Sequence, residues 1–82
     1  SIKSNELECK IYPNPFIENT TIYFSEFKQR TISITDISGR KLKTITSFDK
    51  QIDINRDNMK SGMYFVQIFD GKKQTIIKII LN

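Results

Sequence analysis

Hydrophobic and polar residues alternate along several short stretches of the chain, a pattern that predicts strands with one buried face. The clearest example is TISITD, in which Ile32 and Ile34 alternate with serine and threonine. Turn residues separate such stretches at intervals of roughly ten residues, a spacing typical of a sandwich or barrel. The pattern predicts seven strands, at Glu8–Tyr12, Thr20–Ser25, Thr31–Asp36, Lys41–Thr46, Gln51–Asn55, Gly62–Phe69 and Lys73–Leu81.

Two of these strands depart from simple alternation. In residues 41–46, Leu42 and Ile45 lie three positions apart, so we expect a β-bulge or a loosely packed edge strand. In residues 62–69, both faces carry apolar side chains, which predicts a central strand covered on both sides. Met59, in the preceding loop, is expected to close one end of the core.

Glycine and proline mark the connections between the predicted strands. Pro13 ends the first strand, because proline has no N–H group to donate to a sheet. Gly39, in DISGRK, supplies the positive φ that a tight hairpin needs. Asp70-Gly71 predicts a two-residue hairpin between the last two strands.

The composition agrees with an all-β fold. Fifteen residues are isoleucine and none is alanine, a bias toward pleated surfaces over helices. The chain has 82 residues, of which 38% are apolar, enough for one small core. We expect a single domain at residues 9–82, preceded at residues 1–8 by the polar end of a linker.

Charge and cysteine content exclude several classes of partner. The net charge of +4 is spread along the chain without a dense basic run, so we expect no nucleic-acid binding. There is no apolar run of about 18 residues, so we expect no membrane span. Cys9 is the single cysteine, which rules out an internal disulfide and is interpreted as a small hydrophobic residue beside a strand.

Residues suited to catalysis are scarce. The chain has no histidine, which excludes Ser-His and Cys-His nucleophile pairs. Its three glycines do not form a phosphate-binding loop. We therefore expect no enzymatic activity and no cofactor.

One segment partly matches a calcium-binding loop. Asp53, Asn55 and Asp57 occupy the first, third and fifth positions of the template. The template then requires glycine and glutamate, where this chain has Asn58 and Tyr64. We interpret the segment as a strand end followed by a turn, and expect no metal.

Five motifs in a fixed order resemble one known family. The chain reads IYPNPF, then TTIYFS, ISITDISGRKL, IDINRDNMKSGMYFVQI and finally TIIKIIL. This succession spans residues 10–81 and resembles the C-terminal sorting domain of the bacterial type IX secretion system. It is most similar to the type A class, found in the Bacteroidetes lineage.

The resemblance implies an immunoglobulin-like β-sandwich of about seven antiparallel strands at the end of a larger exported protein. It implies a signal that directs folded cargo from the periplasm across the outer membrane, to the cell surface or the medium. The implied partners are the upstream cargo domain, shuttle and translocon components, and a sortase-like peptidase. That peptidase would cut within or upstream of Ser1–Glu8.

The resemblance also places the signal at four sites in this sequence. Each residue has a structural interpretation as well, as a strand terminator, a turn glycine or a core aromatic, and the sequence leaves both open. The residues are Pro13, Asn14 and Pro15 at a corner, Asp36, Gly39 and Arg40 at a mid-domain turn, Gly62 and Tyr64 in the sixth strand, and Lys78, Ile79 and Ile80 in the last.

The sequence supports two functional hypotheses. In the first, the chain is a sorting domain, a targeting module without enzymatic activity, and a partner adds a strand to the edge of its apolar last strand by β-augmentation. In the second, the chain is an immunoglobulin-like accessory module that binds carbohydrate or protein at the cell surface. Carbohydrate platforms present exposed aromatic side chains, and the candidates are Tyr12, Tyr23, Phe65 and Phe69.

Overall fold

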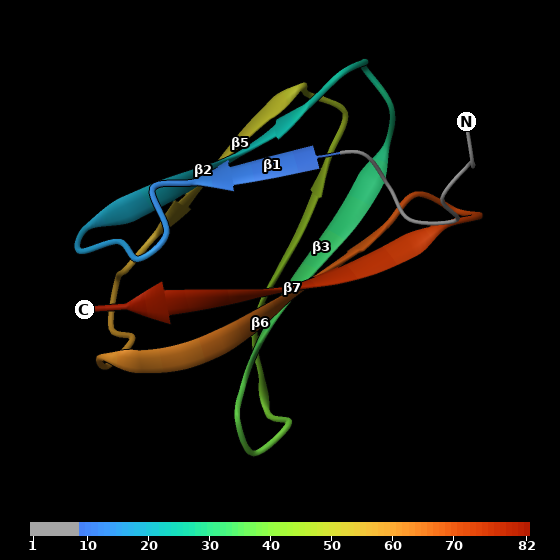
Figure 1. The fold of residues 1–82 in the computed structure, drawn as a ribbon. Coiled ribbons are helices and arrows are strands. Elements are labelled where there is room, and N and C mark those ends of the chain that lie inside the picture. Colours follow the sequence, from blue (N-terminus) through green and yellow to red (C-terminus); the bar gives the residue numbers. More distant parts are fainter. Residues whose placement is uncertain (1–8) are drawn as a thin grey trace, which may run out of the picture.

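The computed structural model describes residues 9–82, which form two antiparallel β-sheets packed face to face (Figure 1). One sheet has the strand order β1-β2-β5 and the other has the order β4-β3-β6-β7. The fold is therefore the all-β, immunoglobulin-like sandwich that the sequence predicts. The strands are β1 (Cys9–Tyr12), β2 (Asn19–Phe24), β3 (Arg30–Asp36), β4 (Lys41–Ser47), β5 (Gln51–Asn55), β6 (Gly62–Phe69) and β7 (Gln74–Leu81).

All seven predicted strands are present, and their limits differ from the prediction by at most one residue within the described part of the chain. The limits of β5 and β6 match. Glu8, the predicted start of the first strand, lies outside the described residues. No helix long and apolar enough to cross a membrane occurs among residues 9–82.

The core lies between the sheets and is built from the alternating apolar positions. Burying one isoleucine side chain stabilises a fold by about 1.5–3 kcal/mol, so these positions fix which face of each strand turns inward. Met59 is 9% exposed and closes one end of this core, as predicted. The fully buried apolar side chains include Phe16, Ile22, Ile32, Ile34, Ile54, Val66, Ile68, Ile79 and Leu81.

Strand β6 is central in its sheet, but the prediction that both of its faces are covered is wrong. Tyr64 is buried on the inner face, whereas Met63 and Phe69 on the outer face are 41% and 46% exposed. The reason is that none of the described residues forms a layer outside the large sheet. The predicted irregularity in the fourth strand is confirmed, because Leu42 is an extra residue where the register between β3 and β4 shifts.

Both tight hairpins are present. Asp36 and Arg40 pair around a three-residue loop, in which Gly39 has a φ of 90°. In the second hairpin, the Asp70 N–H donates to the Lys73 carbonyl, which leaves Gly71 and Lys72 as the loop. The loop therefore lies one residue later than the predicted Asp70-Gly71. Asp70 precedes it, and its carboxylate accepts hydrogen bonds from the N–H groups of Lys72 and Lys73.

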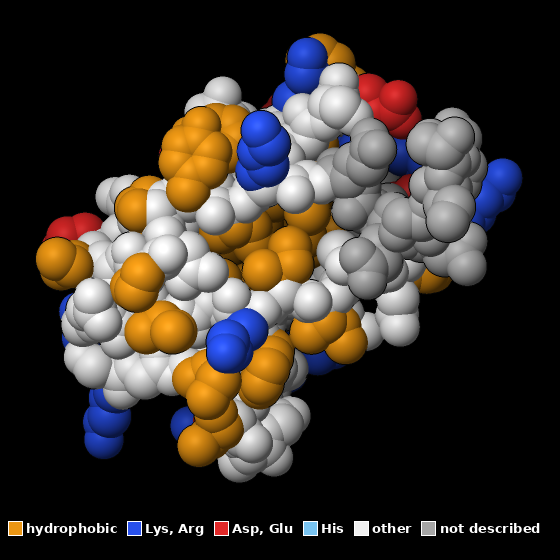
Figure 2. Space-filling model, viewed as in Figure 1, with side chains coloured by type: hydrophobic (Ala, Val, Ile, Leu, Met, Phe, Trp, Pro, Cys, Tyr) orange, Lys and Arg blue, Asp and Glu red, His pale blue; other side chains and the backbone are white. Residues whose placement is uncertain are grey.

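The sandwich is open along the side where β1 and β7 face each other. Cys9 and Ile11 of β1 and Ile77 of β7 are only partly buried at this border of the core. We call these three residues the seam. Figure 2 shows hydrophobic side chains visible between β1 and β7, with basic side chains on either side.

The strands run between two ends of the sandwich, which Figure 1 shows at the upper right and lower left. The Cys9 end contains the start of β1 and the connections at 25–29, 48–50 and 70–73. The motif end contains the corner at 13–18, the turn at 37–40, the loop at 56–61 and the end of β7.

Candidate functional site

All eleven residues that the resemblance singles out lie at the motif end. Asp36, Tyr64 and Ile79 are cross-strand neighbours, one each on β3, β6 and β7. Cross-strand neighbours have Cβ atoms about 5 Å apart, so the three motifs that contain them form one continuous row. Asn14 extends the row, because its side chain is bonded to the β7 residues on either side of Ile79.

The corner holds the edge of β7 through the side chain of Asn14. The Asn14 Nδ2 group donates to the Lys78 carbonyl at 3.0 Å, and Oδ1 accepts from the Ile80 N–H at 2.9 Å. One amide side chain thus makes the pair of bonds that a neighbouring strand would make. The peptide bonds that precede Pro13 and Pro15 are both cis.

Phe16 continues this pairing with its backbone. Its N–H donates to the Ile80 carbonyl at 2.9 Å, and its carbonyl accepts from the Asn82 N–H at 2.8 Å. The Phe16 ring is 1% exposed, because it packs into the core between the sheets. The corner that follows β1 in the small sheet is therefore also bonded to the edge of the large sheet.

Arg56 is the residue at this end that the sequence did not reveal. It follows β5 in a segment that the sequence predicts only as a loop, so no pattern marks it. Its planar guanidinium group can bond several acceptors at once, and here it joins the corner, the loop and the end of β7. The acceptors are the carbonyl oxygens of Ile17 (3.2 Å), Met59 (3.2 Å) and Asn82 (2.9 Å), and the Ser61 hydroxyl (3.2 Å).

Asp36 organises the turn between β3 and β4. Its Oδ1 accepts from the Ser38 hydroxyl at 2.6 Å, the Ser38 N–H at 2.9 Å and the Arg40 N–H at 3.0 Å. These bonds, with the nearby Arg40 side chain, hold the pKa of the Asp36 carboxyl below its usual value. The turn is therefore fixed by an ionised carboxylate at neutral pH, and Arg40 extends from it with 75% of its side chain exposed.

A groove of about 490 Å³ lies between this turn and the loop at 56–61. Leu42, Met59 and Tyr64 contribute its apolar lining, and Arg40 and Lys60 contribute positive charge. The Tyr64 hydroxyl donates to the Lys60 carbonyl, so the ring is held in place. The ion pair between Lys43 and Asp57 also lines the groove. Asp36, Arg40 and Tyr64 line it, whereas Gly39 and Gly62 do not.

The residues of the calcium-loop template serve other contacts. Asp53 accepts a hydrogen bond from the Thr21 hydroxyl at 2.8 Å, and Asp57 is paired with Lys43. Within residues 9–82, there is no group of three or more histidine, cysteine or acidic side chains placed to hold a metal ion.

The four aromatic candidates for a carbohydrate platform are divided between the two sheets. Tyr12 and Tyr23 stack on each other on the small sheet, with ring centroids 4.7 Å apart. Phe65 and Phe69 lie on β6 in the large sheet. The four rings therefore do not form one surface, and no observation favours the accessory-module hypothesis.

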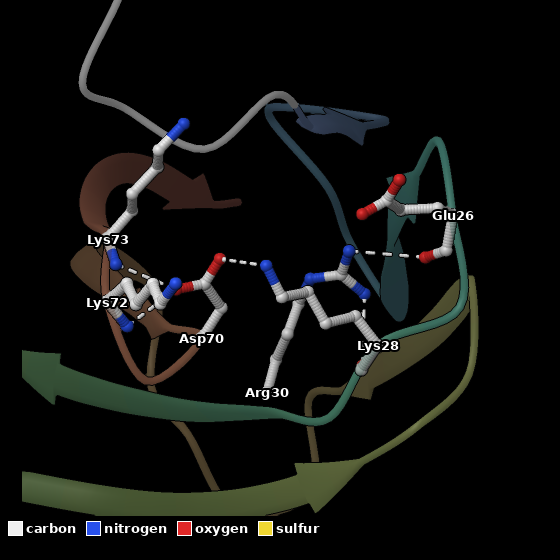
Figure 3. Close-up of polar contacts among 6 residues, drawn as sticks. All are labelled: Glu26, Lys28, Arg30, Asp70, Lys72 and Lys73. Atoms are coloured by element: carbon white, nitrogen blue, oxygen red, sulfur yellow. Dashed lines mark hydrogen bonds and ion pairs between the residues drawn. The ribbon is translucent and has the colours of Figure 1, made fainter.

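The Cys9 end holds a polar cluster of a different kind (Figure 3). The Asp70 carboxylate accepts from the Lys72 and Lys73 N–H groups and pairs with Lys28 at 3.0 Å. Arg30 donates to the carbonyl groups of Lys28 and Glu26, and its guanidinium lies 3.8 Å from the centre of the Phe24 ring. The Lys28–Asp70 pair joins the connection at 25–29 to the connection at 70–73, so we interpret the cluster as structural.

Comparison with known proteins identifies the domain. The family model described as "Secretion system C-terminal sorting domain" matches residues 10–82. A comparison with curated proteins finds no match. Among solved structures, the chain is similar to PorZ, described as an essential bacterial surface component of the type IX secretion system of Porphyromonas gingivalis. The TM-score is 0.77 and the identity 26%, over 90% of this chain and 11% of PorZ, so the chain spans about a tenth of the PorZ length. The chain therefore belongs to the family of C-terminal sorting domains of type IX secretion.

Proposed function

We propose that residues 9–82 direct a folded cargo protein across the outer membrane through the type IX secretion system, with residues 1–8 as the end of the linker to that cargo. The observation that carries this proposal is the placement of the motifs. The chain enters the domain at Cys9, at the end opposite the motif end. A cargo domain joined upstream of β1 therefore leaves the motif end uncovered for recognition.

Shuttle and translocon components recognise the motif end as a folded object. Arg40 and the corner prolines are exposed there, whereas Tyr64 and Ile79 are buried. The corner, the loop and the end of β7 are fastened by Asn14 and Arg56, so the surface exists before a partner arrives. A preformed surface avoids the entropic cost of ordering loops on binding.

A sortase-like peptidase removes the domain once the cargo has left the periplasm. The cut lies within or upstream of residues 1–8, on the side of the chain that enters at the Cys9 end. A peptidase that approaches from that side does not compete with a partner bound at the motif end. The domain itself contributes no catalytic group.

A fusion experiment tests the proposal. Residues 1–82 are joined to the C-terminus of a fluorescent protein that is exported to the periplasm of a host with the secretion system. We expect fluorescence at the cell surface or in the medium, and its retention in the periplasm of a host without the translocon. Equal export from both hosts, or retention in both, would contradict the proposal.

Two matched variants locate the recognised end. Arg40→Gln removes an exposed charge at the motif end, and Lys50→Gln removes one at the Cys9 end. Loss of one favourable charged contact of about 1.4 kcal/mol lowers binding about tenfold, so we expect R40Q to reduce export by about that factor. K50Q should be exported like the unchanged fusion. The reverse order of effects would place recognition at the Cys9 end.

A further inference from the structure

Within residues 9–82, one half of the outer edge of β7 is hydrogen-bonded and the other half, which we call the open half, is not. The N–H and carbonyl groups of Ile80 point outward, since they bond to Asn14 and Phe16 instead of β6. Outward and inward groups alternate along an antiparallel strand, so those of Ile76 and Gln74 point outward as well. No backbone group of residues 9–82 is bonded to the outward N–H or carbonyl of Ile76.

The open half lies beside the seam. Ile77 belongs to both, and across from it Cys9 and Ile11 of β1 are partly buried. On the outer side of the same segment, Ile76 is 59% exposed. A strand placed against this half would cover the seam with one face and contact Ile76 with the other, because side chains alternate across a strand.

Among residues 9–82, the charged side chains next to the open half are basic, with the exception of Asp70. Lys78 is the only charged residue of β7, and Lys10 is the only one in the described part of β1. The hairpin before β7 adds Lys72 and Lys73, while its one acid, Asp70, is occupied by Lys28. Pairing two copies of this edge would bring like charges together, which disfavours a second copy as the occupant.

We propose that the edge of β7 from Gln74 to Lys78 binds a strand of a secretion-machinery protein. The strand is extended over about five residues, with apolar side chains toward the seam and carboxylates near Lys78. This inference rests on the proposed function and assigns a second recognition surface, separate from the corner and groove. It also revises the hypothesis of strand addition along the whole last strand, because Asn14 and Phe16 already occupy the edge from the Lys78 carbonyl onward.

A peptide experiment tests the edge without any export. The probe is the peptide acetyl-Glu-Val-Glu-Val-Glu-amide, added to the chain of residues 1–82, and hydrogen exchange of backbone amides is followed by NMR. We expect slower exchange at the Ile76 N–H, and no change with the matched peptide that has lysine in place of glutamate. Unchanged exchange at Ile76, or protection only along the other edge strands β1, β4 and β5, would overturn the inference.

A proline substitution tests the edge in export. Ile76→Pro removes only an outward N–H, whereas Ile76→Thr keeps it and shortens the same exposed side chain. Loss of one or two backbone hydrogen bonds weakens binding about three- to tenfold, so export of the fluorescent fusion should fall by that factor for I76P and stay near the unchanged level for I76T.

The same experiment separates the two proposals. The amide spectrum of purified I76P shows whether the β6–β7 ladder is intact, and Ile76 is not among the residues at the motif end. If the unchanged fusion and I76P are exported equally well, the inference about the β7 edge is wrong and the proposed function stands. If the unchanged fusion is not exported, the proposed function is wrong. The peptide experiment alone then tests whether the β7 edge binds a strand.

Discussion

Arg56 shows how much of the motif end depends on one side chain. Its guanidinium group bonds three backbone carbonyl oxygens that belong to separate segments of the chain. These carbonyl groups have no strand partner, and Arg56 supplies a donor to each of them. A planar group with five donors meets this need, which a lysine ammonium cannot do in the same geometry.

We expect Arg56→Lys to lower the free energy of unfolding by about 1–3 kcal/mol, because the flexible ammonium satisfies fewer of these acceptors. Urea unfolding followed by circular dichroism measures the change. Lys60→Gln, at an exposed position of the same loop, should stay within about 0.5 kcal/mol of the unchanged domain. If R56K and the unchanged domain have the same free energy of unfolding, the four hydrogen bonds of Arg56 make no net contribution to stability.

Asn14 illustrates the opposite case, a residue whose place was predicted but whose contact was not. The sequence predicts a corner at the prolines, because local rules of proline geometry suffice for that. Its hydrogen-bond partners lie 64 and 66 positions later in the chain. No local pattern encodes such a pairing, so only the fold reveals that the corner closes the edge of β7.

At the scale of elements, the hairpin between β6 and β7 depends on an ionised carboxylate. The pKa of Asp70 is held well below its usual value by the N–H groups of Lys73 and Lys72 and by Lys28. Its side chain is 2% exposed, so water competes little for these bonds. The folded state therefore takes up a proton at this group less readily than the unfolded chain does.

The stability that Asp70 contributes should be fully present above about pH 4, the unfolded pKa, and be lost as the pH falls toward its depressed folded pKa. Asp70→Asn should remove this dependence and cost about 1–3 kcal/mol at neutral pH. The measurement is the urea midpoint between about pH 7 and pH 2. Asp49→Asn is the control, since that residue is exposed; an unchanged slope in D70N would contradict the prediction.

The strands themselves were predictable because their signals are local. The alternation around Ile32 and Ile34 fixes which face is buried, and the spacing of Leu42 and Ile45 indicated the bulge. The pairing of β3 with β6 was not predictable, since it joins segments about 30 residues apart and the alternation is the same for any partner. The open outer face of β6 was missed for a related reason, because apolar residues there indicate burial only when another layer covers them.

For the whole molecule, Phe16 links the two sheets from a position outside their strands. It lies between β1 and β2 in the chain, packs in the core and pairs with β7 through its backbone. A domain of this size buries only about 60% of the surface that its unfolded chain exposes, so it has little stability in reserve. A cavity at Phe16 therefore affects both sheets at once.

Phe16→Ala should cost about 3–5 kcal/mol, a large part of the roughly 5–15 kcal/mol that stabilises a typical domain. Circular dichroism at increasing urea concentration should show a midpoint near zero denaturant or no folded baseline. Phe48→Ala removes an equal ring that is 62% exposed and should change stability by about 0.5 kcal/mol or less. The same small effect at both positions would show that the corner is not part of the core.

The pairing of the corner with β7 also joins a part of the domain that is synthesised early to the part of it that is synthesised last. Asn14 and Phe16 are made early by the ribosome, but the groups they bond, from Lys78 to Asn82, are the last of the domain to be made. A chain that stops before Ile80 has no partner for the corner and leaves one side of β6 unpaired beyond that point. Products that stop there would therefore lack the hydrogen bonds of Ile80 and Asn82 that fasten the motif end.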